Sequence, residues 1–202
     1  MMKIYCAPLD GGNGSKQAYS LLEKMFRAEY GGALPVINKT PNGKPFFPER
    51  PEIHFSLSHA GTHVLCALSD TPIGVDIESP REISPRAVSY FCSEEELRFF
   101  DPLDLWVFKE SYIKLIGGVL TMVKSVRFSL VSEYAGVDCN VIKSAAVSVT
   151  AKKDGAAAVG EPAASWLYRV GDCRAAVSAF GDKPPCSIEL ISGSVDRLFG
   201  SE

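Results

Sequence analysis

The sequence has little of the features that mark several large functional classes. Its 21 lysines and arginines are outnumbered by 24 aspartates and glutamates, giving a formal charge of -3, so no basic excess indicates nucleic-acid binding. No apolar run approaches the roughly 20 residues that cross a bilayer. The first residues also lack the apolar core and cleavage site of a signal peptide. We therefore expect a cytoplasmic protein with no membrane or nucleic-acid partner.

Cysteine and histidine show no metal-binding spacing. Six cysteines lie at positions 6, 66, 92, 139, 173 and 186 without any CxxC pair, and the 3 histidines are not spaced with a cysteine pair. A zinc site is therefore not expected. The cysteines are typical of a reduced chain in which thiols serve as small hydrophobic residues.

The composition and residue patterns predict an α+β fold. With 46% hydrophobic and 22% charged residues, the chain is neither disordered nor a coiled coil. Helical spacing of apolar residues follows Ser15, the expected N-cap, and recurs over about 85–117 with a break near Pro102. A surface loop is expected over 154–164. The expected strands are 3–7, 53–58, 63–69, 73–78, 126–131, 142–149, 166–170 and 174–180, with a further edge at 187–191.

The order of these elements suggests an internal duplication. Both parts of the chain run strand, helix and then antiparallel strands, with a boundary near residue 72. We therefore expect a pseudo-duplicated two-lobe fold in which each lobe is a small antiparallel sheet packed with a helix. The predicted lobes are 1–72 and 73–202.

Two acids on one predicted strand are the first candidates for chemistry. Side chains alternate along a strand, so Ile73, Val75 and Ile77 should face the core while Asp76 and Glu78 share the other face. Neighbouring carboxylates repel each other unless a proton or a cation lies between them, and a hard divalent ion prefers such oxygen ligands. The alternative is a solvated strand face with two unrelated acids.

A third acid lies on the predicted helix 103–117. Glu110 and Lys114 fall within a stripe of otherwise apolar residues, and a charge on a packing face needs a partner. One interpretation is a third metal carboxylate with a lysine beside it. The other is an internal pair between Glu110 and Lys114 at i,i+4.

Hydrogen-bond donors suited to an anion occur earlier in the chain. Ser58 and His59 end the predicted strand 53–58, and Lys44 lies in a turn. A histidine on an ordinary surface is the simpler alternative. Three acids for magnesium together with these donors indicate a substrate that bears phosphate groups.

Four segments, in order, resemble the 4′-phosphopantetheinyl transferases. They are Gly43-Lys44-Pro45, His54-Phe55-Ser56-Leu57-Ser58-His59, Gly74-Val75-Asp76-Ile77-Glu78 and Trp106-Val107-Phe108-Lys109-Glu110-Ser111-Tyr112-Ile113-Lys114. The resemblance is to the larger, two-lobed, surfactin-synthetase-activating class and extends over about residues 43–120.

This resemblance implies a function and a site. The chain would be a magnesium-dependent holo-[acyl-carrier-protein] synthase, acting as a monomer. It would transfer 4′-phosphopantetheine from coenzyme A to a serine of an apo acyl or peptidyl carrier protein and release 3′,5′-ADP. The site would lie between the lobes, with coenzyme A nucleotide contacts in the N-terminal one. The implied residues are Asp76, Glu78 and Glu110 for magnesium, Asn42, Gly43, Lys44, Ser58 and His59 for coenzyme A, and Glu110 and Lys114 for catalysis.

Other hypotheses remain open at this stage. The short stretch before the first helix is compatible with a degenerate homologue that binds coenzyme A or a carrier protein without transfer. A magnesium phosphohydrolase is a third possibility, although no separate water-activating group is evident. Carrier-protein contacts could come from four residues expected to be exposed, unless they are ordinary surface: Arg86, Lys109, Met122 and Lys124.

Overall fold

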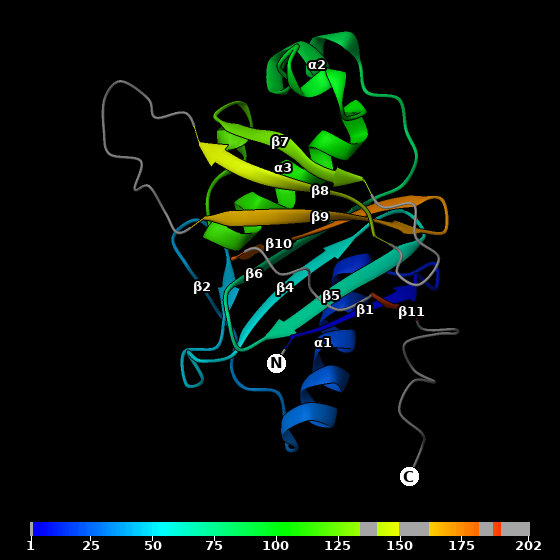
Figure 1. Cartoon of the computed structure of the whole chain (residues 1–202). Coiled ribbons are helices and arrows are strands. Elements are labelled where there is room, and N and C mark those ends of the chain that lie inside the picture. The colour runs from blue at the N-terminus through cyan, green and yellow to red at the C-terminus, as the bar shows by residue number, and fades with distance from the viewer. Residues whose placement is uncertain (1, 134–140, 150–161, 182–187, 191–202) are drawn as a thin grey trace.

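The computed structural model describes residues 2–133, 141–149, 162–181 and 188–190, which form an α+β fold with two main sheets (Figure 1). This confirms the predicted fold class; the internal duplication stays a prediction. The elements are β1 (Met2–Pro8), α1 (Gly14–Tyr30), β2 (Asn38–Lys39), β3 (Pro45–Phe46), β4 (His54–His59), β5 (His63–Ser69), β6 (Ile73–Glu78), α2 (Pro85–Phe91), η1 (Glu96–Arg98), α3 (Pro102–Ile116), η2 (Leu120–Lys124), β7 (Val126–Glu133), β8 (Val141–Val149), β9 (Ala163–Val170), β10 (Cys173–Phe180) and β11 (Glu189–Leu190).

The first sheet has the strand order β11-β1-β5-β4 and is covered on one face by α1. The helix begins at Gly14 because the Asn13 side chain accepts a hydrogen bond from the Lys16 N–H, so the prediction of Ser15 as N-cap is wrong. Asparagine is a strong N-cap residue because its short side chain reaches the free N–H groups of the first turn. The buried residues of α1 recur at helical spacing and pack on β4 and β5: Ala18, Leu21, Leu22, Met25 and Phe26.

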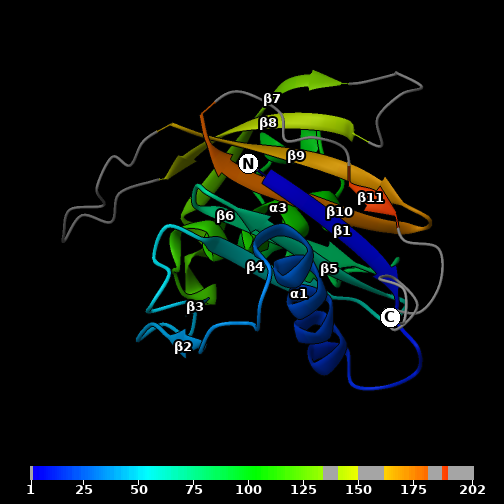
Figure 2. The same ribbon diagram turned by 90° about the horizontal axis from the view of Figure 1, so that it is seen from below.

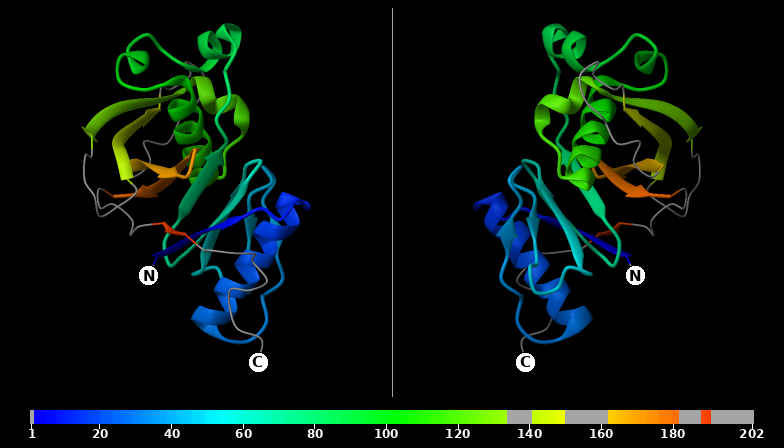
Figure 3. Two further views of the ribbon diagram at one scale, coloured as in Figure 1. Left: turned by 90° about the vertical axis from the view of Figure 1, so that its right-hand side faces the viewer. Right: turned by 90° about the vertical axis from the view of Figure 1, so that its left-hand side faces the viewer.

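The second sheet has the order β6-β10-β9-β8-β7 and carries α3 on one face. Its opposite face packs against the first sheet in a shared core that includes Ile4, Leu65, Val75 and Trp166. The molecule is therefore layered as α1, first sheet, second sheet and α3, and the views in Figures 2 and 3 show α1 lying on the outer side of β4 and β5.

The edge strands of the two sheets are joined by side chains. The hydroxyl of Ser56 accepts the N–H of Val75, and the hydroxyl of Ser58 accepts the N–H of Ile77. These bonds satisfy two buried N–H groups of β6 that would otherwise lack partners at a sheet edge. They also fix β4 beside β6, and thereby fix Ser58 beside the acids of β6.

Most predicted strands are confirmed, and β6 has the predicted bounds. The loop expected over 154–164 is wrong at its end, because Ala163 and Ala164 belong to β9; positions 154–161 lie outside the described residues. The edge expected at 187–191 appears as β11, parallel to β1, although positions 187 and 191 are not described. Within the described residues, no helix is both long and apolar enough to cross a membrane.

The cysteines that the structure describes behave as expected. Cys6, Cys66, Cys92 and Cys173 are free thiols, and three of the four are buried. Burial raises the pKa of Cys6 to about 12 and that of Cys92 to about 11, which keeps both protonated near neutral pH. Cys139 and Cys186 lie outside the described residues.

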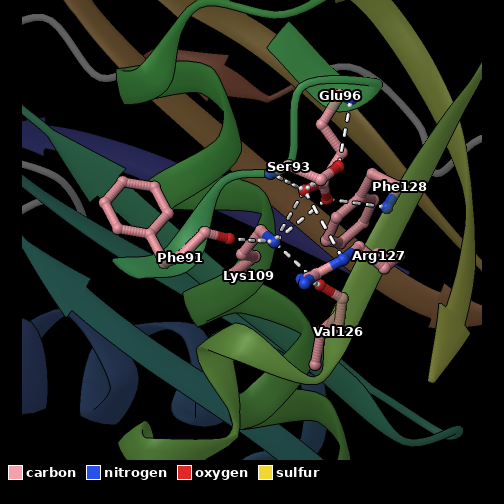
Figure 4. A network of polar contacts seen from close by, with 7 residues as sticks. All are labelled: Phe91, Ser93, Glu96, Lys109, Val126, Arg127 and Phe128. Atoms are coloured by element: carbon pink, nitrogen blue, oxygen red, sulfur yellow. Dashed lines mark hydrogen bonds and ion pairs between the residues drawn. The ribbon is translucent and has the colours of Figure 1, made fainter. Parts of the chain in front are cut away.

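Lys109 is fully buried, so its predicted exposure is wrong. Its ammonium lies 3.0 Å from Glu96 and donates to the carbonyls of Phe91 and Val126, both at 2.7 Å (Figure 4). Glu96 also accepts the backbone N–H of Phe128. The pair therefore ties α3 to the end of α2 and the start of β7. Helical spacing did not predict that Lys109 is buried, because α3 is apolar on several faces.

Replacing Lys109 with methionine should lower the free energy of unfolding by about 3–5 kcal/mol, because the buried Glu96 carboxylate then keeps only the more distant Arg127, at 4.0 Å, as a cation. Urea denaturation of the wild type and K109M measures this. The double variant E96Q/K109M should recover part of the loss, since it removes the buried negative charge. Equal stability of K109M and the wild type would show that the pair contributes nothing.

Candidate active site

Three carboxylates converge where β6 meets α3. Asp76 and Glu78 come from β6 and Glu110 from α3, and each offers an oxygen within 4.8 Å of the others. Asp76 is only 2% exposed, so the alternative of a solvated strand face is wrong for it. The predicted core residues Ile73, Val75 and Ile77 are buried between the sheets.

The convergence depends on a glycine. A Cβ atom on Gly74 would lie 2.0 Å from the Ser111 carbonyl oxygen and 2.3 Å from the Leu115 nitrogen, both backbone atoms of α3. Only a residue without a side chain lets the helix backbone approach β6 this closely. The close approach in turn places Glu110 and Lys114, one helical turn apart, next to the acids of β6.

Lys114 and Ser58 both bond to Asp76. The Lys114 ammonium lies 2.6 Å from Asp76 Oδ1, and the Ser58 hydroxyl donates to the same oxygen at 2.7 Å. Among the described residues, Lys114 forms its ion pair with Asp76. The alternative interpretation, an internal pair between Glu110 and Lys114, is therefore wrong. This pairing leaves the Glu110 carboxylate available for other partners.

The pKa values of the acids reflect burial and crowding. Burial raises the pKa of Asp76, while the Lys114 ammonium opposes that rise. Burial, followed by the nearby charge of Asp76, raises the pKa of Glu110 to about 7. Glu110 is therefore close to half protonated near neutral pH, as suits a group that accepts a proton in a reaction.

The donor set fits a hard divalent cation. Asp76 Oδ2 is buried without a hydrogen-bond partner among the described residues, and such an atom is costly unless something else binds it. Three carboxylates with oxygens this close also repel one another. Magnesium prefers carboxylate oxygens of this kind, so these residues fit that ion.

The remaining predicted site residues line one pocket with the acids. The cavity, of about 460 Å³, lies where the edge strands β4 and β6 meet, and residues of α1, the turn around Lys44 and α3 also line it. It is lined by every residue that the sequence assigned to magnesium, coenzyme A or catalysis: Asn42, Gly43, Lys44, Ser58, His59, Asp76, Glu78, Glu110 and Lys114.

Two of these residues also bond to the end of α3. Lys44 donates to the Leu115 carbonyl at 2.6 Å and Asn42 donates to the Gly117 carbonyl at 2.9 Å. The last carbonyls of a helix have no partner within the helix, so these donors satisfy two of them. Burial lowers the pKa of Lys44 to about 8.

Known proteins are similar in sequence to the part of the chain that carries the carboxylates. Residues 72–159, which contain Asp76, Glu78, Glu110 and Lys114, match the sequence model of the 4′-phosphopantetheinyl transferase superfamily. The predicted resemblance is confirmed. The chain is 38% identical over 90 residues to 4′-phosphopantetheinyl transferase Sfp of Bacillus subtilis, which is 40% of each chain. It is 37% identical over 122 residues, 50% of each chain, to 4′-phosphopantetheinyl transferase gsp of Aneurinibacillus migulanus. The chain thus spans half or less of the length of these relatives.

Two residues around Glu78 were not predicted as part of a transferase-like site. Trp106 Nε1 donates to Glu78 Oε1 at 3.0 Å, and Arg81 donates to both carboxylate oxygens at 3.3 Å. Trp106 was recognised only as a motif residue. Arg81 lies three residues beyond Glu78 in an irregular segment, where no sequence periodicity indicates the direction of a side chain.

Gly74→Ala should displace α3 and lower the free energy of unfolding by about 3 kcal/mol or more, since the new methyl group meets backbone atoms that cannot move independently. Gly61→Ala is the matched control, because its Cβ would meet only the Ser79 hydroxyl at 3.5 Å. Urea denaturation compares the two. If Gly74→Ala were as stable as Gly61→Ala, the close approach would not constrain the helix.

Lys44 should make stability depend on pH. Its pKa is about 8 in the folded chain against 10.5 for an ordinary lysine, so between these values the unfolded state binds more protons. The free energy of unfolding should therefore rise with pH over this interval, whereas below it the full cost of the buried charge is present. Lys44→Met should remove that part of the rise. Unfolding at several pH values between about 7 and 10 tests this, and parallel curves for both proteins would contradict it.

Proposed function

We propose that this protein transfers the 4′-phosphopantetheine group of coenzyme A to a serine of an apo acyl or peptidyl carrier protein. The observation that carries the proposal is that three carboxylates, a lysine and the predicted coenzyme A residues line a single pocket. The confirmed resemblance supports the same reaction, which would be magnesium-dependent and would release 3′,5′-ADP.

Asp76, Glu78 and Glu110 would hold the magnesium ion. When bound, the ion supplies positive charge that stabilises negative charge developing on the phosphate oxygens. A cation bound to Asp76 would neutralise that carboxylate in place of Lys114. The ammonium of Lys114 could then bind another group. The released ammonium lies in the pocket, where a substrate phosphate could accept its N–H groups.

Lys44, Ser58 and His59 would contact the phosphates of coenzyme A, with Asn42 and Gly43 near its nucleotide. A lysine ammonium has three donors, and the Leu115 carbonyl accepts one of those of Lys44, so two remain for an anion. The His59 side chain is exposed at the end of β4 and lines the pocket. The two parts of the chain, 1–72 and 73–202, would thus contribute the nucleotide contacts and the acids respectively.

Glu110 would act as the base. The serine hydroxyl of the carrier attacks the β-phosphorus, its proton passes to Glu110 directly or through a water, and the bond from phosphorus to the bridging oxygen breaks. The electron pair of that bond leaves with 3′,5′-ADP. Burial raises the pKa of Glu110 to about 7, and a magnesium ion at the site would lower that pKa and keep the carboxylate deprotonated, so that it could accept a proton near neutral pH.

All the groups in this scheme come from one chain. The turn around Lys44 and the strand β4 line the pocket together with β6 and α3. A monomer therefore suffices to build the proposed site, and we propose that the protein acts as one.

Incubation with coenzyme A, magnesium and a panel of apo carrier proteins tests the proposal. Intact-protein mass spectrometry should show a gain of one phosphopantetheine group on at least one carrier, and a chelator should abolish it. Glu110→Gln should lower kcat by about 10²-fold or more, because it removes the proton acceptor. Glu94→Gln, which alters an exposed acid on the segment between α2 and η1, is the matched control and should transfer normally.

The outcomes separate transfer from binding. No gain on any carrier, combined with coenzyme A binding measured by calorimetry, would contradict the transferase proposal and leave a binding protein. Release of 3′,5′-ADP without any carrier would indicate hydrolysis instead. Equal activity of Glu110→Gln and the wild type would remove Glu110 from the proposed mechanism.

A further inference from the structure

Arg81 makes the outermost contact of the carboxylate cluster. Its Nε donates to Glu78 Oε2 and its Nη2 to Glu78 Oε1, both at 3.3 Å. The guanidinium also lies over the Trp106 ring, 5.9 Å from the ring centroid. The Arg81 side chain is 45% exposed and that of Glu78 is 25% exposed, so the pair sits at the mouth of the site and not in the core.

Two positive side chains of the protein neutralise two of the three carboxylates. Asp76 is paired with Lys114 and Glu78 with Arg81, while no ion pair to Glu110 occurs among the described residues. Each acid of β6 therefore has its own counterion in the absence of metal. A divalent cation bound by the same carboxylates would lie close to the ammonium of Lys114 and the guanidinium of Arg81. It would be repelled by both positive charges.

The oxygens of Glu78 are also heavily used. Oε1 accepts hydrogen bonds from Trp106 and Arg81, which occupy both of its lone pairs, and Oε2 accepts one from Arg81. A metal ion that binds Glu78 must therefore share an oxygen with Arg81 or replace it. The Trp106 bond can persist, because the indole carries no net charge and its helix is fixed by packing.

We infer that Arg81 is a displaceable counterion, which holds Glu78 while the site is free of metal and competes with a divalent cation for that carboxylate. The inference rests on the metal site of the proposed function. It assigns to Arg81 a role in setting how tightly the site binds its ion. It also implies that the guanidinium leaves the Trp106 ring as the ion binds.

Mn²⁺ binding tests the inference without any turnover. The electron paramagnetic resonance signal of the free ion measures how much Mn²⁺ is bound. Arg81→Gln should bind Mn²⁺ about threefold more tightly, as expected for the loss of one partly exposed opposing charge. Arg81→Lys should bind like the wild type, because it retains the charge. Arg86→Gln is the control for net charge, since it removes an exposed arginine from α2.

Tryptophan fluorescence provides a second measurement. The chain has 2 tryptophans, and Trp106→Phe leaves only the buried Trp166 as background. Saturating Mg²⁺, which unlike Mn²⁺ is not a paramagnetic quencher, should change the Trp106 emission more in the wild type than in Arg81→Gln, because only the wild type has a guanidinium to move from the ring.

The possible failures can be told apart. Weaker Mn²⁺ binding by Arg81→Gln would mean that Arg81 orients Glu78 for the metal. Unchanged binding would mean that Arg81 has no effect on metal affinity. Either result would overturn the inference and leave the proposed metal site intact. Absence of Mn²⁺ binding by the wild type, with no difference from Asp76→Asn, would contradict the metal site itself and this inference with it.

Discussion

The close contact between the α3 backbone and Gly74 is the constraint on which the site depends. A strand and a helix ordinarily pack through side chains, which would keep Glu110 and Lys114 farther from the acids of β6. Here two backbones touch, because the atom that would separate them is missing at Gly74. The buried pair of Lys109 and Glu96 holds the same helix from its other side. The helix is thus fixed between two contacts that tolerate little change.

The electrostatics of the site follow from that packing. Bringing three carboxylates together is unfavourable, and the folded chain relieves the repulsion by three different means. Lys114 neutralises Asp76 inside the pocket, Arg81 neutralises Glu78 at its mouth, and Glu110 is partly protonated because its pKa is about 7. Each of these is reversible, so the proposed magnesium ion could take over the neutralisation of the carboxylates.

The sequence predicted these features unequally, for physical reasons. Alternation along 73–78 predicted β6 and the placement of Asp76, because strand periodicity is local. The ion pair between Lys114 and Asp76 could not be read from helical spacing, since it depends on how closely α3 approaches β6. Lys109 was misjudged for a similar reason: a lysine is usually exposed, and only the tertiary fold supplies three buried acceptors.

The bonds from Asn42 and Lys44 to α3 make the two sides of the pocket interdependent. These residues belong to a turn that precedes the β4–β5 hairpin of the first sheet, yet they donate to carbonyls at the end of the helix that carries Glu110 and Lys114. An anion bound by Lys44, as we propose, would share the ammonium with the Leu115 carbonyl. Binding at the turn would therefore lie close to the end of α3, one helical turn or less from Lys114. The proposed nucleotide contacts and catalytic groups are in this way parts of one connected structure.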